Sequence, residues 1–249
     1  MFLSQRYHEV FGRLPIFGMI HLAGDDQLSR AFNEIAIFEE ESVDGVIIEN
    51  YHGSINDVES TLLETAWRKP NLKIGVNILP NEFYRDFALA EKYNADFIQL
   101  DHISGTYRSG TLNFESYKEC KEKHPEIMVF GGVWPKYYRP VKESDLEADL
   151  KVGMQRAEAI VVTGEGTGKE TPLDKIKKFR EVLGEHHLII GAGLNHDNAY
   201  EQLRLADGAI VGSCFKSDNN TRHSVDRRRV RDFMAVVNEV REYKENIKS

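Results

Sequence analysis

The sequence predicts an α/β fold, a single (β/α)₈ TIM barrel with a parallel eight-stranded sheet. Short apolar runs rich in valine and isoleucine recur along the chain, and amphipathic segments of helical length separate most of them. Continuous apolar runs are typical of parallel strands that helices cover. Repeated strand–helix alternation is typical of α/β folds. The length of 249 residues suits one such barrel. A doubly wound open sheet is the alternative.

The expected strands are the eight apolar runs, and the expected helices are the amphipathic segments between and after them. The strands are Ile16–Leu22, Gly45–Asn50, Lys73–Leu79, Asp96–Asp101, Ile127–Val133, Ala159–Gly164, His187–Gly193 and Gly208–Ser213. The helices are Ser29–Val43, Glu82–Tyr93, Glu143–Ala157, Pro172–Leu183, His196–Leu205 and Val225–Lys244.

The whole chain, residues 1–249, is expected to form one domain, because no long linker rich in glycine, serine or proline divides it. Residues 1–14 are expected to cap the barrel floor with a short helix. The polar residues 245–249 are expected to fray.

Composition and charge exclude several classes of function. The net charge of −8 disfavours nucleic acid as a partner. Cys120 and Cys214 form no CxxC motif, so neither a disulfide framework nor a thiolate zinc site is expected. No apolar run approaches the roughly 20 residues that span a bilayer, and no signal peptide is visible. We therefore expect a cytoplasmic protein without membrane insertion, metal or cofactor.

Glycines at the ends of the last two expected strands predict a phosphate site. Gly191 and Gly193 end the seventh strand, and Gly212 and Ser213 end the eighth. Glycine lets backbone N–H groups approach an anion closely, and barrels of this type frequently bind phosphate at these two strand ends. A short helix after the eighth strand is expected to contribute as well. The alternative is that the glycines serve only tight turns.

Polar residues at the other strand ends are candidates for catalysis, because barrel active sites lie at the carboxyl ends of the strands. Alternation along the strand places Gln99 with Asp101 on one side of the sheet, and Gly75 with Asn77. Polar side chains are costly to bury among helices, so these should face the barrel mouth. The catalytic candidates are Glu49, Asp101, Lys136 and His21, and the substrate-binding candidates are Asn77, His102, Thr163, Gly164 and Gly168.

Each candidate also has a structural interpretation. His21 could be a hydrogen-bonded barrel histidine, and Asp101 could cap the following loop. Glu49 could form an ion pair with a neighbouring strand, and Lys136 could be solvated.

The glycine-rich segment 163–170 superficially resembles a P-loop. A P-loop requires glycine where Thr163 stands and serine or threonine where Glu170 stands. We therefore interpret the segment as a flexible loop over the site, whose N–H groups or Lys169 would reach an anion.

Motifs along nearly the whole chain resemble the BtpA/SgcQ family. They are Ile16–Leu22, Gly45–Asn50, Gly75–Leu79, Ile160–Gly164 with Thr167–Gly168, Ile190–Gly193 with Asn198, Ala206–Ser213, and Val225–Asp226 with Arg229–Val230 and Phe233–Met234. The resemblance implies a TIM barrel related to ribulose-phosphate-binding barrels. One member of that family is linked to photosystem I biogenesis, and others resemble products of sugar-utilisation gene clusters.

The chain departs from the family pattern at two strand ends. The family usually carries Asp-Val on the fifth strand with Lys-His shortly after, whereas this chain has Gly132-Val133 and Lys136-Tyr137. The family usually ends the fourth strand in Arg-Val-Asn, whereas this chain has Gln99-Leu100-Asp101. The acid has in effect moved to the fourth strand.

Three functions remain open from the sequence. The first is an isomerase, epimerase or lyase acting on a small phosphorylated metabolite, such as a sugar phosphate or a nucleotide-like compound. The second is a non-catalytic assembly or regulatory factor. The third is a metal-dependent hydrolase that would use His21, His52, Asp101 and His102 as ligands. A homo-oligomer is among the arrangements that the sequence leaves open.

Overall fold

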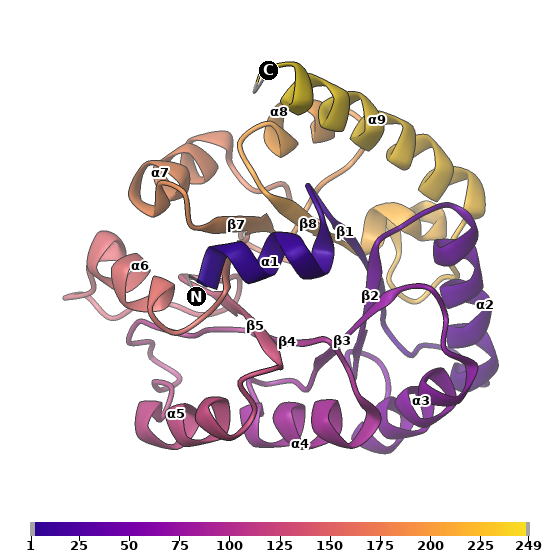
Figure 1. The fold of residues 1–249 in the computed structure, drawn as a ribbon, viewed down its shortest axis with the longest axis horizontal. Coiled ribbons are helices and arrows are strands. Elements are labelled where there is room, and N and C mark those ends of the chain that lie inside the picture. Colours follow the sequence, from indigo (N-terminus) through magenta and orange to yellow (C-terminus); the bar gives the residue numbers. More distant parts are fainter. Residues whose placement is uncertain (1–2, 248–249) are drawn as a thin grey trace.

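Eight parallel strands form a closed barrel in chain order, in a computed structural model that describes residues 3–247 (Figure 1). β1 pairs with both β2 and β8, which closes the sheet and excludes the open alternative. The predicted (β/α)₈ barrel is confirmed. The strands are β1 (Ile16–Ile20), β2 (Gly45–Glu49), β3 (Lys73–Asn77), β4 (Phe97–Leu100), β5 (Met128–Gly132), β6 (Ala159–Val162), β7 (His187–Ile190) and β8 (Gly208–Val211).

Helices surround the barrel, except α1, which lies across its floor (Figure 1). The helices are α1 (Leu3–Phe11), α2 (Gln27–Glu40), α3 (Ile55–Arg68), α4 (Phe83–Tyr93), α5 (Phe114–Lys123), α6 (Leu146–Met154), α7 (Leu173–Leu183), α8 (Ala199–Leu203) and α9 (Arg227–Asn246). Two of them, α3 and α5, were not among the segments expected to be helical. Where a short helix was expected after β8, the chain forms the 3₁₀ turns Ser213–Phe215 and Ser217–Asn219.

The lower half of the barrel interior is filled by aromatic side chains. Phe17, Phe97 and Phe130 pack together there, and Tyr7 and Phe11 of α1 close the layer from below. Gly75 makes room for this layer, because a Cβ at that position would lie 2.3 Å from the Phe97 ring. The floor is therefore solid, and any ligand must enter from the opposite, carboxyl end of the strands.

The structure describes both chain ends only in part. α9 continues through Glu245 and Asn246, two residues of the segment expected to fray. Residues 1–2 and 248–249, which also belong to the expected cap and tail, lie outside the described residues. Among residues 3–247, no helix has both the length and the apolar character needed to cross a bilayer.

Candidate active site

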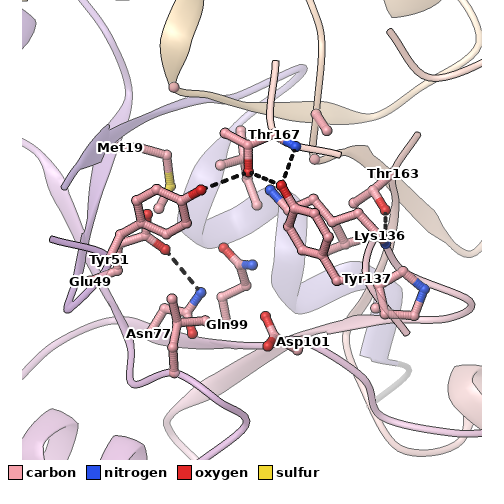
Figure 2. Close-up of a pocket in the computed structure, with 18 of the residues that line it drawn as sticks. Met19, Glu49, Tyr51, Asn77, Gln99, Asp101, Lys136, Tyr137, Thr163 and Thr167 are labelled. Atoms are coloured by element: carbon pink, nitrogen blue, oxygen red, sulfur yellow. Dashed lines mark hydrogen bonds between the residues drawn. The ribbon is translucent and has the colours of Figure 1, made fainter. Parts of the chain in front are cut away.

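A cavity of about 410 Å³ lies at the carboxyl ends of the strands (Figure 2). The apolar layers fill the barrel below this cavity. At the next inward-facing positions many of the residues are polar or glycine, and the cavity lies among them. The predicted residues that line this cavity are His21, Glu49, Asn77, Asp101, Lys136, Thr163, Gly168, Gly191, Gly193, Gly212 and Ser213.

Glu49, the last residue of β2, is almost fully buried in the cavity wall. Burial raises the pKa of Glu49 to about 8, with Lys136 opposing the rise and Asp101 adding to it. The neighbouring strand supplies a hydrogen bond, because Asn77 Nδ2 donates to Glu49 Oε2 at 3.5 Å. A carboxyl group poised near neutral pH is suited to general acid–base chemistry.

His21, which directly follows β1, is the second buried titratable group of the wall. Its Nε2 lies 3.5 Å from Glu49 Oε1. Burial lowers the pKa of His21 well below its ordinary value, and the positive charge of Lys216 lowers it further. At neutral pH the imidazole is therefore uncharged and faces a carboxyl group that is mostly protonated.

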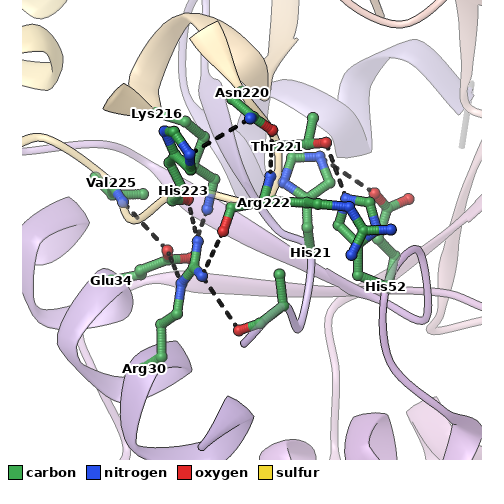
Figure 3. A network of polar contacts seen from close by, with 12 residues as sticks. His21, Arg30, Glu34, His52, Lys216, Asn220, Thr221, Arg222, His223 and Val225 are labelled. Carbon is green, nitrogen blue, oxygen red and sulfur yellow. Dashed lines mark hydrogen bonds and ion pairs between the residues drawn. The ribbon is translucent and has the colours of Figure 1, made fainter. Parts of the chain in front are cut away.

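A buried ion pair lies behind His21 (Figure 3). Lys216 is inaccessible to solvent, and its Nζ lies 2.6 Å from Glu34 Oε2 on α2. Glu34 Oε1 also accepts hydrogen bonds from Arg30 Nε and the Val225 backbone N–H. Arg30 in turn donates to the Arg222 backbone carbonyl. These contacts hold the segment after β8, which begins with the expected phosphate residues Gly212 and Ser213, against α2.

Asp101 and Lys136 lie near Glu49, and their charges affect its pKa. Burial raises the pKa of Asp101, opposed by a hydrogen bond that the Tyr138 hydroxyl donates to Oδ2 at 2.7 Å. The backbone of Lys136 is held by its N–H, which donates to Thr163 Oγ1 at 2.7 Å. Within residues 3–247, Lys136 is the one lysine or arginine that lines the cavity.

The strand ends of β7 and β8 form the glycine-lined side of the cavity. Gly193 has φ +73°, and a Cβ there would lie 2.1 Å from the Lys169 carbonyl oxygen. Asn198 Nδ2 holds this turn by donating to the Gly193 carbonyl at 3.0 Å. A Cβ at Gly212 would lie 3.1 Å from the His21 ring. A side chain would therefore collide with backbone at Gly193 and press on His21 at Gly212, whereas glycine allows this close packing at both strand ends.

Three hydroxyl groups meet over the cavity (Figure 2). The Tyr51 and Tyr137 hydroxyls both donate to Thr167 Oγ1, at 3.3 and 3.1 Å. The Thr167 backbone N–H donates to the Tyr137 hydroxyl at 2.9 Å. These contacts connect the loops that follow β2, β5 and β6, and none of them was expected from the sequence. Tyr137 is part of an aromatic segment that the sequence shows plainly, but Thr167 lies 30 residues away from it.

Two predicted substrate-binding residues, His102 and Gly164, are not part of the cavity lining. The His102 ring packs against Tyr107 and Tyr138, and burial lowers its pKa to about 4. Gly164 packs against the Glu170 backbone. Lys169, which was expected to reach an anion, lies outside the lining as well, whereas Gly168 contributes to it.

The four metal ligands considered from the sequence do not form a cluster. His52 Nε2 instead contacts Thr221 Oγ1 at 2.9 Å. In the described part of the chain, no three His, Cys, Asp or Glu side chains are grouped so that they could hold a metal ion. The metal-hydrolase alternative therefore lacks its ligand set.

Comparison with known protein families gives a match along most of the barrel. The sequence model of the BtpA family matches residues 15–239. The chain belongs to the BtpA family. An uncharacterised protein of Methanocaldococcus jannaschii is 27% identical over 93% of this chain and 98% of its own length. The photosystem I biogenesis protein BtpA of Synechocystis is 24% identical over 90% of this chain and 88% of its own length. An uncharacterised mitochondrial protein of Caenorhabditis elegans is 27% identical over 90% and 92%.

Solved structures similar to this BtpA-family barrel share its fold at low sequence identity. The structure named "Native KDPGal structure" superposes with a TM-score of 0.66 at 14% identity, covering 92% of this chain and 97% of the other. A phosphoribosyl anthranilate isomerase from Thermococcus kodakaraensis superposes with a TM-score of 0.62 at 17% identity, covering 90% and 98%. Identities this low establish the barrel fold alone.

Proposed function

We propose that this BtpA-family barrel binds a small phosphorylated metabolite and catalyses proton transfer on it, as an isomerase, epimerase or lyase. The observation that carries the proposal is the composition of a single cavity. Gly191, Gly193, Gly212 and Ser213 line it just after β7 and β8. Glu49 lines it from the end of β2, Asp101 from the position after β4, and Lys136 from the loop after β5. One compound can therefore contact both groups. A cytoplasmic setting suits a ligand of this type.

The glycine-lined side would hold the phosphate group of the ligand. The backbone N–H groups of Gly193, Gly212 and Ser213 would supply neutral donors, which would allow phosphate binding without arginine in the described lining. The N–H group of Gly191 already donates to the Val162 carbonyl at 2.8 Å. The phosphate would then fix the distance between the rest of the ligand and Glu49. Positioning of this kind contributes a large part of enzymatic rate enhancement.

Glu49 would act as the general base. In its carboxylate form it removes a proton from a carbon next to a carbonyl group, and the electron pair of the broken C–H bond forms an enolate. The ammonium group of Lys136 stabilises the negative oxygen. For an isomer, the hydroxyl proton on the deprotonated carbon moves to the enolate oxygen, and Glu49 returns its own proton to the former carbonyl carbon. For an epimer, solvent supplies a proton to the opposite face of the deprotonated carbon, and Glu49 releases its proton to solvent. The rate should rise as pH increases through about 8, the pKa of Glu49.

Hydrogen–deuterium exchange tests this chemistry even when the reaction product is unidentified. Phosphorylated aldoses and ketoses are incubated with the protein in D₂O, and proton NMR follows loss of the C–H signal. Wild-type protein should exchange at least one compound, and Glu49→Gln should lose the exchange while it still binds the compound. Glu122→Gln, on an exposed face of α5, is the matched control and should exchange normally. Absence of exchange with every compound would contradict the catalytic proposal.

A non-catalytic assembly role is the second candidate, and the similarity to the photosystem I biogenesis protein of Synechocystis favours it. Such a role would not depend on the acid–base group. Complementation of a strain that lacks its own BtpA-family protein would separate the two candidates. The Glu49→Gln variant should complement if the role is assembly, and should fail if it is catalysis.

A further inference from the structure

Two amide side chains, Asn77 at the end of β3 and Gln99 on β4, lie side by side in the cavity wall. Their strands pair in register, with Gly75 opposite Phe97, and each amide is two residues further along. Asn77 is only 2% exposed. Both side chains line the cavity, next to the carboxyl groups of Glu49 and Asp101 (Figure 2).

The oxygen atoms of both amides lack hydrogen-bond partners. Asn77 Nδ2 donates to Glu49, but Asn77 Oδ1 and Gln99 Oε1 are buried and accept no hydrogen bond from the described residues. Nearly all buried polar atoms in proteins have a partner. Two adjacent unpaired acceptors inside a cavity therefore indicate that a ligand supplies the donors.

The donors that fit this wall are hydroxyl groups. A hydroxyl group can donate to an amide oxygen and can also accept a hydrogen bond from a protonated carboxyl group, such as Glu49 at neutral pH. A carboxylate on the ligand offers only acceptors. It would meet the oxygens of Asn77, Gln99 and Asp101, and Lys136 is the single basic side chain among the described lining residues that could balance its charge.

We propose that Asn77 and Gln99 select a phosphorylated sugar whose unphosphorylated part carries neighbouring hydroxyl groups and no carboxylate. The two amides are specificity-determining residues, since they accept hydrogen bonds from adjacent sugar hydroxyls while the phosphate lies at β7 and β8. The inference rests on the proposed function, because it assigns the second half of the same ligand. It also excludes sugar-acid phosphates as preferred ligands.

Calorimetric titration with matched compounds tests the selection. The probes are an aldopentose 5-phosphate, its 2-deoxy analogue, the corresponding aldonic acid 5-phosphate and inorganic phosphate. The aldopentose phosphate should bind at least about tenfold more tightly than each of the other compounds, because a missing hydroxyl leaves a buried acceptor unpaired.

Apolar variants of similar shape test the two residues. Asn77→Leu and Gln99→Met should each lower the affinity for the aldopentose phosphate about tenfold or more, and leave the affinity for inorganic phosphate unchanged. Asn71→Leu, just before the other end of β3, is the control and should change neither affinity. Gln99→Met provides the test alone if Asn77→Leu fails to fold, as judged by circular dichroism.

The outcomes separate this inference from the proposed function. If inorganic phosphate binds but the sugar-acid phosphate or the 2-deoxy analogue binds as tightly as the aldopentose phosphate, the hydroxyl selection is overturned and the phosphate site stands. Unchanged sugar affinity in both variants also overturns it. If no phosphorylated compound binds, the proposed function and this inference both fall.

Discussion

His21 Nε2 lies 3.5 Å from Glu49 Oε1, and both side chains are almost completely removed from solvent. Burial shifts the two groups toward their neutral forms, since it raises the pKa of Glu49 and lowers that of His21. The contact therefore joins a protonated carboxyl group to a neutral imidazole at pH 7. This pairing is the electrostatic basis of the proposed acid–base chemistry.

The buried carboxyl group should make stability depend on pH. The folded state raises the pKa of Glu49 from 4.5 to about 8, so folding favours the protonated form. The free energy of unfolding therefore falls as pH rises above 4.5, because ionising Glu49 costs more in the folded state than in the unfolded state. This loss of stability reaches its full size above about pH 8. Each pKa unit corresponds to about 1.4 kcal/mol. Glu49→Gln should gain stability relative to wild type by roughly a few kcal/mol between pH 5 and pH 8.5.

Urea denaturation at the two pH values measures this difference. Glu122→Gln on α5 is the control, and its difference from wild type should not change with pH. An equal difference for Glu49→Gln at pH 5 and pH 8.5 would show that Glu49 is not a buried group with a raised pKa.

The buried pair of Lys216 and Glu34 should be strongly coupled. Removing one charge leaves the other unpaired in the interior, so Lys216→Met should destabilise the protein by about 3–5 kcal/mol. The double variant Lys216→Met/Glu34→Gln should lose at least about 1 kcal/mol less stability than the sum of the losses in the two single variants. A double-mutant cycle by chemical denaturation measures this coupling energy.

The exposed pair of Glu147 and Lys151 on α6, with Nζ 2.7 Å from Oε1, is the matched control for the cycle. Its coupling energy should be much smaller, because water screens exposed charges. Equal coupling in the two pairs would mean that burial does not strengthen the contact between Lys216 and Glu34.

Gly193 should tolerate a methyl group less well than a glycine with a similar φ. Gly193 and Gly12 have φ values of +73° and +74°, but of the two only Gly193 would place a Cβ against backbone, 2.1 Å from the Lys169 oxygen. Gly12→Ala should cost about 1–2 kcal/mol of stability from its positive φ alone. Gly193→Ala should cost more and should also weaken phosphate binding. Thermal and chemical denaturation measure the loss of stability in each variant. If the two glycine variants lose equal stability, the close approach between Gly193 and the Lys169 backbone is contradicted.

The strand pattern was predictable, because strands covered by helices are apolar almost throughout. The missed helices have weaker patterns. The sequence of α5 is mostly polar, and the helix buries a single residue, Tyr117. α3 exposes the large apolar residues Leu63 and Trp67, which obscures its buried face. The helix expected at His196–Leu205 is observed as the shorter α8, Ala199–Leu203. It is preceded by a turn in which Asn195 Oδ1 accepts hydrogen bonds from the Asp197 and Asn198 N–H groups.

The side chains that line the cavity were largely predictable, because they occupy defined positions at strand ends. Asn77, Gln99 and Asp101, which the alternation argument places toward the barrel mouth, line the cavity. The contacts that support the site were not predictable. Glu34 and Lys216 are 182 residues apart, and Tyr138 reaches Asp101 from a different loop. Such contacts depend on loop conformation, which carries no periodic signal in the sequence.

Backbone NMR with inorganic phosphate tests the central claim most directly. The account predicts that the amide signals of Gly193, Gly212 and Ser213 shift together with one dissociation constant, while the signal of Gly184 stays unchanged. Ser213→Asp should abolish the shifts, because a carboxylate would repel the anion, and chloride at equal ionic strength should not produce them. If phosphate moves none of these three signals, or shifts only signals elsewhere, the ends of β7 and β8 are not a phosphate site and the account is contradicted.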